Sequence, residues 1–249
     1  MDLYLYPSLR GDPILSGLTA MRREVYAPLL KFAEERGFTT QTAREYAIRA
    51  ALKTPLGVDL SLALPYLKSD AQTIYSTFFT PDWDEKCAEN GLLPLPRGVG
   101  NAPGEDGYKR AVASMVNAAT ADELFELMRG FYAENTDEAE AMYRAFSWDG
   151  GLQGIAKPDT IELDELGGLE PQKAALLENT AAFISGRPAN DVLLTGASGT
   201  GKSSCVKALL NRFAQDGLRL AEVRRSELHT LPALLDVLSR KRRRYIVFI

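Results

Sequence analysis

One glycine-rich stretch carries the residues of this chain that are best suited to chemistry. It reads GASGTGKSS and comprises Gly196, Ala197, Ser198, Gly199, Thr200, Gly201, Lys202, Ser203 and Ser204. The stretch fits the pattern G-x-x-x-x-G-K-[ST], whose backbone N–H groups surround phosphate oxygens. Because glycine tolerates positive φ, we expect the backbone to bend at Gly196, Gly199 and Gly201 and to form a concave loop.

The side chains that close this stretch predict a nucleotide site. Lys202 is expected to reach the β- and γ-phosphates of ATP as a point charge. The Ser203 hydroxyl is expected to ligate Mg²⁺, a hard cation that prefers oxygen. Ser204 opens a helix, whose free N–H groups and dipole also favour an anion, and its own role is less defined. The alternative is a glycine-rich turn that binds no ligand.

The flanking segments are those that a phosphate-binding loop requires. Residues 192–195 are a short apolar run, which we interpret as a strand buried on both faces. After the loop, Val206, Leu209, Leu210 and Phe213 recur at helical spacing, and Gly217 follows where a helix usually stops. Strand, glycine-rich turn and helix together give the motif its expected context.

The rest of the C-terminal half alternates helices and strands. We expect helices over about 170–184 and 231–238, and strands over 218–223 and 245–249. Pro171 falls in the first turn of the first of these helices, where proline is tolerated. The alternation predicts a parallel sheet in an α/β domain.

The N-terminal half is predicted to be helical. The expected helices cover about 18–35, 40–52, 69–79, 83–90, 108–117, 121–131 and 137–146. Residues 92–107 hold seven glycines and prolines and are expected to form a loop. Several aromatic residues of this half could form either a binding surface or a helical core, and we favour the core: Tyr26, Phe32, Tyr66, Tyr75, Phe78, Phe79, Phe131 and Tyr132.

Composition and length indicate two globular domains. The chain has 249 residues, 45% of them hydrophobic and 25% charged, with a net charge of −4. A glycine-rich junction at 148–154 places the boundary between a helical domain, 1–147, and a second domain, 148–249. The start lacks the features of a signal peptide, no segment has the length of a membrane span, and there are two cysteines, so we expect a cytoplasmic protein without a membrane partner.

Other candidate sites are weaker. The basic run 240–244 could bind a polyanion, but a solvated loop fits an acidic chain better, and we do not expect nucleic acid as a partner. His229 is the single histidine, so it cannot build a histidine metal cluster, and we expect it at the surface. Cys205 starts a helix, where a thiol can become reactive, but a small residue packed beneath the loop is the simpler interpretation.

Residues 146–249 resemble the AAA+-type P-loop ATPases, and more narrowly the bacterial ATP-binding family known as domain of unknown function 815. The resemblance lies in several short motifs, which read WDG at 148–150, PD at 158–159, LDELGG at 163–168, QK at 172–173, NT at 179–180, GRPAN at 186–190, GASGTGKSS at 196–204 and GLRL at 217–220. It implies a helical N-terminal domain followed by a P-loop NTPase domain, an AAA+-like parallel α/β/α fold truncated after its third strand. It also implies that Leu166 and Gly167, with Ile155 as a further candidate, contact the adenine base; an ordinary turn before a helix is the alternative.

The resemblance leaves enzyme activity open. In the family the third strand runs into two acidic residues that act on Mg²⁺ and water, and this sequence stops at Ile249, before such residues, so we expect an N-terminal fragment without catalytic residues of its own. The full-length protein would be an ATPase that remodels an unknown protein partner through its helical domain. A ring-shaped homo-oligomer of the full-length protein also fits the family. The alternative is a switch module that binds ATP with little turnover, and a small-molecule kinase is a third option.

Overall fold

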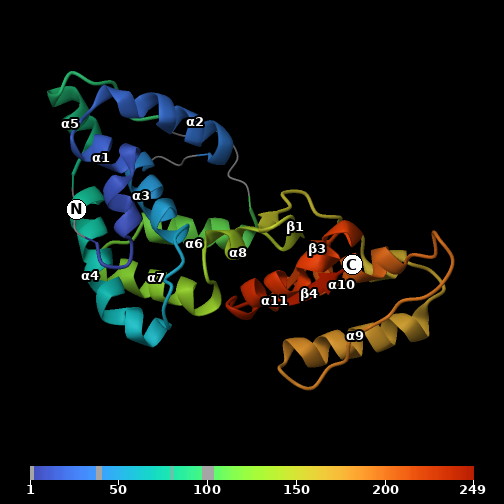
Figure 1. The fold of residues 1–249 in the computed structure, drawn as a ribbon. Helices are drawn as coiled ribbons and strands as arrows, with labels where there is room; N and C mark the ends of the chain where they lie inside the picture. The colour runs from blue at the N-terminus through green and yellow to red at the C-terminus, as the bar shows by residue number, and fades with distance from the viewer. Residues whose placement is uncertain (1–2, 38–40, 80, 97–103) are drawn as a thin grey trace. The chain divides into compact units, whose positions relative to one another are not determined.

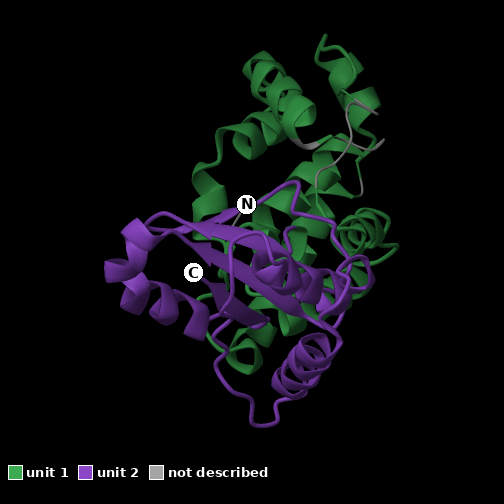
Figure 2. Ribbon diagram, turned by 90° about the vertical axis from the view of Figure 1, so that its right-hand side faces the viewer, with its two compact units in different colours: residues 1–142 green, residues 143–249 purple. Residues whose placement is uncertain are grey.

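The computed structural model of this chain describes residues 3–37, 41–79, 81–96 and 104–249 (Figure 1). The chain folds into two compact units, Met1–Met142 and Tyr143–Ile249, coloured separately in Figure 2. The second unit begins at Tyr143 rather than at Trp148, because residues just before Trp148 form a strand of its sheet.

Unit 1 is helical throughout its described residues. Its elements are η1 (Pro7–Gly11), α1 (Pro13–Thr19), η2 (Arg23–Val25), α2 (Tyr26–Arg36), α3 (Thr42–Leu52), α4 (Leu60–Phe78), α5 (Trp83–Glu89), α6 (Asp106–Val116), α7 (Ala121–Glu134) and α8 (Glu138–Met142). The helices predicted at 83–90, 108–117 and 121–131 are confirmed as α5, α6 and α7. The helix predicted at 40–52 corresponds to α3, and its residue 40 and residues 97–103 of the predicted loop lie outside the described residues.

Three helix predictions in unit 1 need correction. The single helix expected at 18–35 is two helices, because the chain turns at Met21, which has a φ of 50°. The helix expected at 69–79 is much longer, since α4 begins at Leu60 and contains Pro65. Pro65 is the sixth residue of α4, so the helical hydrogen bond that it cannot donate is the one to Ser61 in the first turn. The rest of α4 keeps its hydrogen bonds and continues. The helix expected at 137–146 ends at Met142, and a strand follows.

The core of unit 1 forms where the long helix α4 packs against α7. Phe78 of α4 and Tyr132 of α7 are almost completely buried, and the hydroxyl of Tyr132 donates to the carbonyl of Ala51 over 3.1 Å. The buried carboxylate of Asp70 accepts the N–H groups of Tyr4 and Leu5, and burial raises its pKa. Four of the eight aromatic residues predicted to be core are buried, three are half-buried and Tyr66 is 49% exposed, so that prediction is confirmed in part.

Unit 2 contains a four-stranded mixed sheet, so the chain as a whole is a mixed α/β protein. The strands are β1 (Ala145–Trp148), β2 (Leu152–Gly154), β3 (Leu218–Val223) and β4 (Arg244–Phe248), in the order β2-β1-β3-β4. β3 is parallel to β1 and β4, whereas β1 and β2 are antiparallel. The remaining elements are η3 (Leu163–Glu165), α9 (Glu170–Ile184), α10 (Lys202–Phe213), η4 (Arg225–Thr230) and α11 (Leu231–Ser239).

Helices cover both faces of this sheet, because successive side chains of a strand point to opposite faces. On one face, Leu218 and Leu220 of β3 pack in a cluster with Leu210 of α10. On the other face, Ala221 and Val223 pack in a cluster with Leu234 of α11. The helices predicted at 170–184 and 231–238 and the strands predicted at 218–223 and 245–249 are confirmed, with ends that agree within one residue.

The buried strand predicted at 192–195 is wrong. The segment lies outside the sheet, and Val192 and Leu193 are 52% and 87% exposed. In the described sheet β4 is an edge strand, and the segment does not pair with it. Leu194 instead packs, partly buried, against the cluster that contains Leu176 and Cys205. The predicted parallel sheet is confirmed for β1, β3 and β4 only, because the β1–β2 hairpin, which lies in the glycine-rich junction, adds an antiparallel pair.

The β1–β2 hairpin depends on a glycine beneath an aromatic ring. A methyl group placed on Gly154 would lie 2.1 Å from Cδ2 of Tyr143. We predict that Gly154→Ala lowers the free energy of unfolding of unit 2 by about 1–3 kcal/mol, because the ring must move out of its packed position. Urea unfolding followed by the fluorescence of Trp148, in a Trp83→Phe background, measures this change.

The matched control lies in the same hairpin. A methyl group on Gly151 would come no closer than 3.9 Å to a neighbouring atom, Nε2 of Gln153. Gly151→Ala should therefore leave the unfolding midpoint nearly unchanged. Equal midpoints for the two variants would show that the contact between Gly154 and Tyr143 does not constrain the hairpin.

Candidate functional site

The glycine-rich stretch forms a loop whose path requires glycine at three positions. Gly196, Gly199 and Gly201 have φ angles of 145°, 80° and 83°. Residues with a side chain rarely adopt these values, so the positive φ predicted at all three glycines is confirmed. Residues 196–200 are exposed, which leaves the backbone of the loop accessible to a ligand.

The loop ends at the start of α10, whose first turn offers backbone donors. Gly201 is the N-cap and has a left-handed backbone conformation. Because glycine has no side chain, it makes no side-chain capping hydrogen bond. The helical hydrogen bonds begin with the N–H of Cys205, which donates to the carbonyl of Gly201 over 2.8 Å. The N–H groups of residues 202–204 precede this bond and, with the helix dipole, favour an anion at this end of α10.

The ammonium group of Lys202 lies over the loop. It donates to the carbonyl of Gly196 over 2.9 Å and to the carbonyl of Ala197 over 2.6 Å. The hydroxyl of Thr200 donates to the same Ala197 carbonyl over 2.9 Å and lies 3.3 Å from the ammonium nitrogen. The positive charge is therefore held on the same short loop as the positive-φ glycines, within the stretch that sequence reasoning singled out.

An asparagine on α9 holds the segment that leads into the loop. The side chain of Asn179 donates to the carbonyl of Asn190 over 2.8 Å and accepts the N–H of Asn190 over 2.9 Å. Asn179 thus makes the pair of bonds that a neighbouring strand would otherwise make with Asn190. Sequence reasoning missed this role, because an asparagine within a helix gives no signal of a distant backbone partner.

The structure brings Leu166 next to the loop. A methyl group on Gly201 would lie 3.7 Å from Cδ2 of Leu166 and 4.0 Å from Cδ1 of Leu169. Leu166 is half-buried, and the adjacent Gly167 is exposed. Ile155 does not join them, because it packs in the cluster around Leu210 and not in the cluster that contains Leu166.

The turn that carries Leu166 is tied to both helices beside it. Asn211 of α10 donates to the carbonyls of Asp159 and Ile161, over 3.0 and 2.7 Å. Lys173 of α9 donates to the carbonyls of Leu163 and Leu166, over 3.2 and 2.7 Å. Lys173 was absent from the predicted site, since nothing in the sequence distinguishes a buried lysine from an exposed one in an amphipathic helix.

The weaker candidate residues lie in three different environments. Cys205 is 4% exposed and packs with Leu176 and Leu209, which matches a small residue beneath the loop. His229 is exposed, and its Nδ1 lies 2.9 Å from the carbonyl oxygen of Ser226. In the basic run, the guanidinium group of Arg244 lies over the ring of Phe183 at 5.5 Å.

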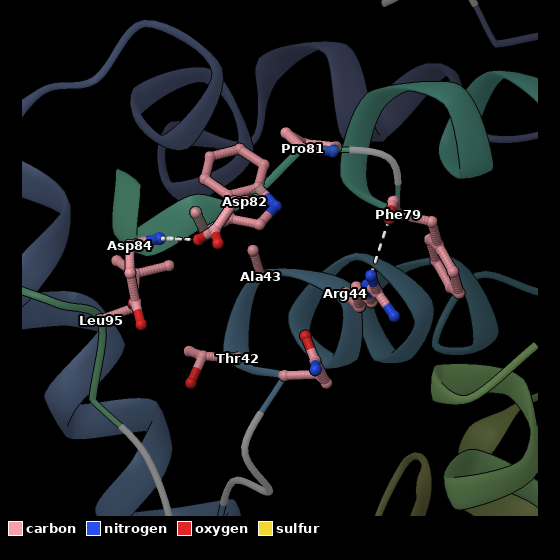
Figure 3. A pocket seen from close by; sticks show the side chains of 10 residues that line it. Thr42, Ala43, Arg44, Phe79, Pro81, Asp82, Asp84 and Leu95 are labelled. Atoms are coloured by element: carbon pink, nitrogen blue, oxygen red, sulfur yellow. Dashed lines mark hydrogen bonds between the residues drawn. The ribbon is translucent and has the colours of Figure 1, made fainter. Parts of the chain in front are cut away.

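Unit 1 contains a separate cavity of about 510 Å³, shown in Figure 3. It lies between the start of α3 and the start of α5, and its lining includes Arg44, Phe79, Asp82 and Leu95. The guanidinium group of Arg44 lies over the ring of Phe79 and donates to its carbonyl over 2.7 Å. Oδ1 of Asp82 accepts the N–H groups of Asp84 and Glu85 at the start of α5. These polar groups stabilise the local fold, and we assign no ligand to the cavity.

Residues 3–37, 41–79, 81–96 and 104–249 contain neither a metal-binding cluster of side chains nor a membrane-spanning helix. No group of three or more histidine, cysteine, aspartate or glutamate side chains in these ranges is placed to hold a metal ion. None of their helices combines the length and the apolar character needed to span a bilayer.

Residues 141–249 match the model of a family described as "Protein of unknown function (DUF815)". The matched residues include all of unit 2. Comparisons with curated proteins and with solved structures gave no match.

The contact between Asn179 and Asn190 gives a testable prediction. We expect Asn179→Ala to accelerate hydrogen exchange of the Asn190 amide by roughly fivefold, because a bond of about 1 kcal/mol is lost from an exposed segment. Amide exchange measured by NMR tests this at the residue concerned. Glu178→Ala changes an exposed neighbour on the same helix and should leave this amide unaffected. An unchanged exchange rate in Asn179→Ala would mean that the segment is held by other contacts.

Proposed function

We propose that unit 2 binds ATP together with Mg²⁺ at the loop formed by residues 196–204. The observation that carries this proposal is the combination of three positive-φ glycines, an accessible helix start and the Lys202 ammonium within one short loop. Backbone donors that converge on one region and a neighbouring cation are what a triphosphate requires. Gly196, Ala197, Ser198, Gly199 and Thr200 would supply the loop, and Lys202 would exchange its carbonyl partners for phosphate oxygens.

Residues beside the loop would bind the adenine base and the Mg²⁺ ion. Leu166 and Gly167 would contact the adenine base, since Leu166 offers half-buried apolar surface close to Gly201. Ser203 is exposed in the first turn of α10, where its hydroxyl could reach a metal ion bound to the phosphates. One hydroxyl ligand fits Mg²⁺, which keeps several waters and takes its other ligands from the substrate phosphates.

We further propose that the full-length protein is an AAA+-type P-loop ATPase that remodels an unknown protein partner through its helical domain. Two features depart from the fold expected of this class, namely the mixed sheet and the segment 192–195, which belongs to no strand. Hydrolysis also needs a group that orients the attacking water, and Lys202 with Ser203 provides only charge stabilisation and metal binding. We therefore expect this chain to bind ATP with little turnover.

The alternative function is a switch, in which ATP occupancy alters a partner surface without hydrolysis. Steady release of inorganic phosphate from ATP by the purified chain would favour an enzyme. Release only in the presence of an added acceptor would favour a small-molecule kinase. Binding without release would favour the switch for this chain.

The primary test is the removal of the Lys202 charge. We predict that Lys202→Ala weakens binding of a fluorescent ATP analogue, in the presence of Mg²⁺, by at least about tenfold, because a charge-assisted hydrogen bond contributes roughly 1.5–3 kcal/mol. A fluorescence titration gives the dissociation constant. Lys157→Ala removes an exposed lysine of the same unit outside the loop and should bind as the unchanged protein does. Equal affinities for the Lys202 and Lys157 variants would refute a phosphate site at Lys202.

The proposed role of Ser203 makes a separate prediction. Ser203→Ala should weaken binding of ATP by about fivefold to tenfold in Mg²⁺, through loss of one ligand, and should have no effect in EDTA. Titrations in the two buffers measure the difference directly. Ser226→Ala, an exposed serine distant in sequence from the loop, controls for loss of a hydroxyl. A loss of the same size with and without Mg²⁺ would assign Ser203 to the phosphates rather than to the metal.

A further inference from the structure

Lys173 is a buried cation whose acceptors lie mostly on one turn. The residue is 7% exposed, and its ammonium group donates to the carbonyls of Leu163 and Leu166 and pairs with a carboxylate oxygen of Glu170 at 2.7 Å. An ammonium group has three donors, and these three acceptors satisfy all of them. Because a buried cation without partners is costly, the position of Lys173 and the position of the turn constrain each other.

The two carbonyls bound by Lys173 lie at opposite ends of the Leu163–Leu166 turn. The turn is also closed by the N–H of Leu166, which donates to the carbonyl of Leu163 over 3.2 Å. The carboxylate of Glu165 accepts the N–H of Glu162 over 2.7 Å at the exposed side. Lys173 thus joins this turn to α9 by hydrogen bonds on the buried side, beside the packing of Leu163 with Leu176.

The same turn presents apolar surface beside the phosphate loop. Leu166 and Leu169 are both half-buried, and both lie next to the Cα of Gly201. Leu163 anchors the turn below, in a cluster with Cys205 and Leu209 of α10. A shift of the turn would change the distance between this apolar surface and the start of α10, and would leave the glycine conformations of the loop unaffected.

We infer that Lys173 is a positioning residue for the nucleotide site. By fixing the Leu163–Leu166 turn against Gly201, it sets the affinity for the base of a bound nucleotide and leaves the affinity for the phosphates unchanged. The inference rests on the proposed function, because it assigns a role to Lys173 in that same site. It goes beyond that proposal because it separates the affinity for the base from the affinity for the phosphates and assigns the affinity for the base to Lys173, which lies outside the glycine-rich motif.

The test compares two ligands, MgATP and magnesium tripolyphosphate, which carries the phosphates without a base. Competition against a fluorescent ATP analogue, or calorimetry, gives both affinities for each protein. Lys173→Met should weaken MgATP binding by roughly tenfold, the usual effect of one lost well-placed interaction, while tripolyphosphate binding stays unchanged. Lys173→Arg, which keeps a buried donor group, should recover at least part of the preference for MgATP.

The outcomes separate a positioning role from a structural one. Equal loss of both ligands in folded Lys173→Met, or no loss of either, would overturn the inference and leave the phosphate site in place. Failure of the unchanged protein to bind either ligand would overturn the proposed function and the inference with it. If circular dichroism shows that Lys173→Met does not fold, Lys173→Gln is compared in the same way, because its amide is uncharged and one bond shorter and so weakens the bonds to the turn, and a selective loss of MgATP binding is again expected.

Discussion

A loop that offers its backbone N–H groups to a ligand cannot use the same groups to stabilise itself. This constraint applies directly to residues 196–201, of which 196–200 are exposed, and which follow a path that three positive-φ glycines make possible. Glycine also has the largest conformational freedom in the unfolded chain, so ordering this loop is costly. The stabilisation must therefore come from the elements on either side of the loop.

The two sides are held in different ways. On the downstream side, Gly201 leads directly into α10, which is fixed by the burial of Leu209 and Leu210 under the sheet and the neighbouring helix. On the upstream side the segment 192–195 belongs to no strand, and within it only Leu194 is partly buried, against the cluster that contains Cys205. The backbone of Asn190 is held instead by the side chain of Asn179.

The sequence was sufficient where a local pattern determined the structure and insufficient where a distant partner did. Pro171 and the apolar spacing that follows it placed α9 correctly, and the glycine positions predicted the loop conformation. The apolar run at 192–195 looked like a buried strand, but whether a strand forms depends on a free partner, which composition does not reveal. The β1–β2 hairpin could have been found, since Asp149-Gly150 between apolar runs is a recognised hairpin signal, which we attributed to a junction between domains.

Both contacts that the sequence could not reveal come from the same helix. Lys173 near the start of α9 holds the Leu163–Leu166 turn, and Asn179 further along holds Asn190. One helix therefore supports the segment that precedes the loop and the apolar surface that borders its end. A displacement of α9 would move both supports together, whereas α10 would stay in place through its packing against the sheet. A change in the position of α9 relative to α10 would therefore alter the geometry on both sides of the loop together.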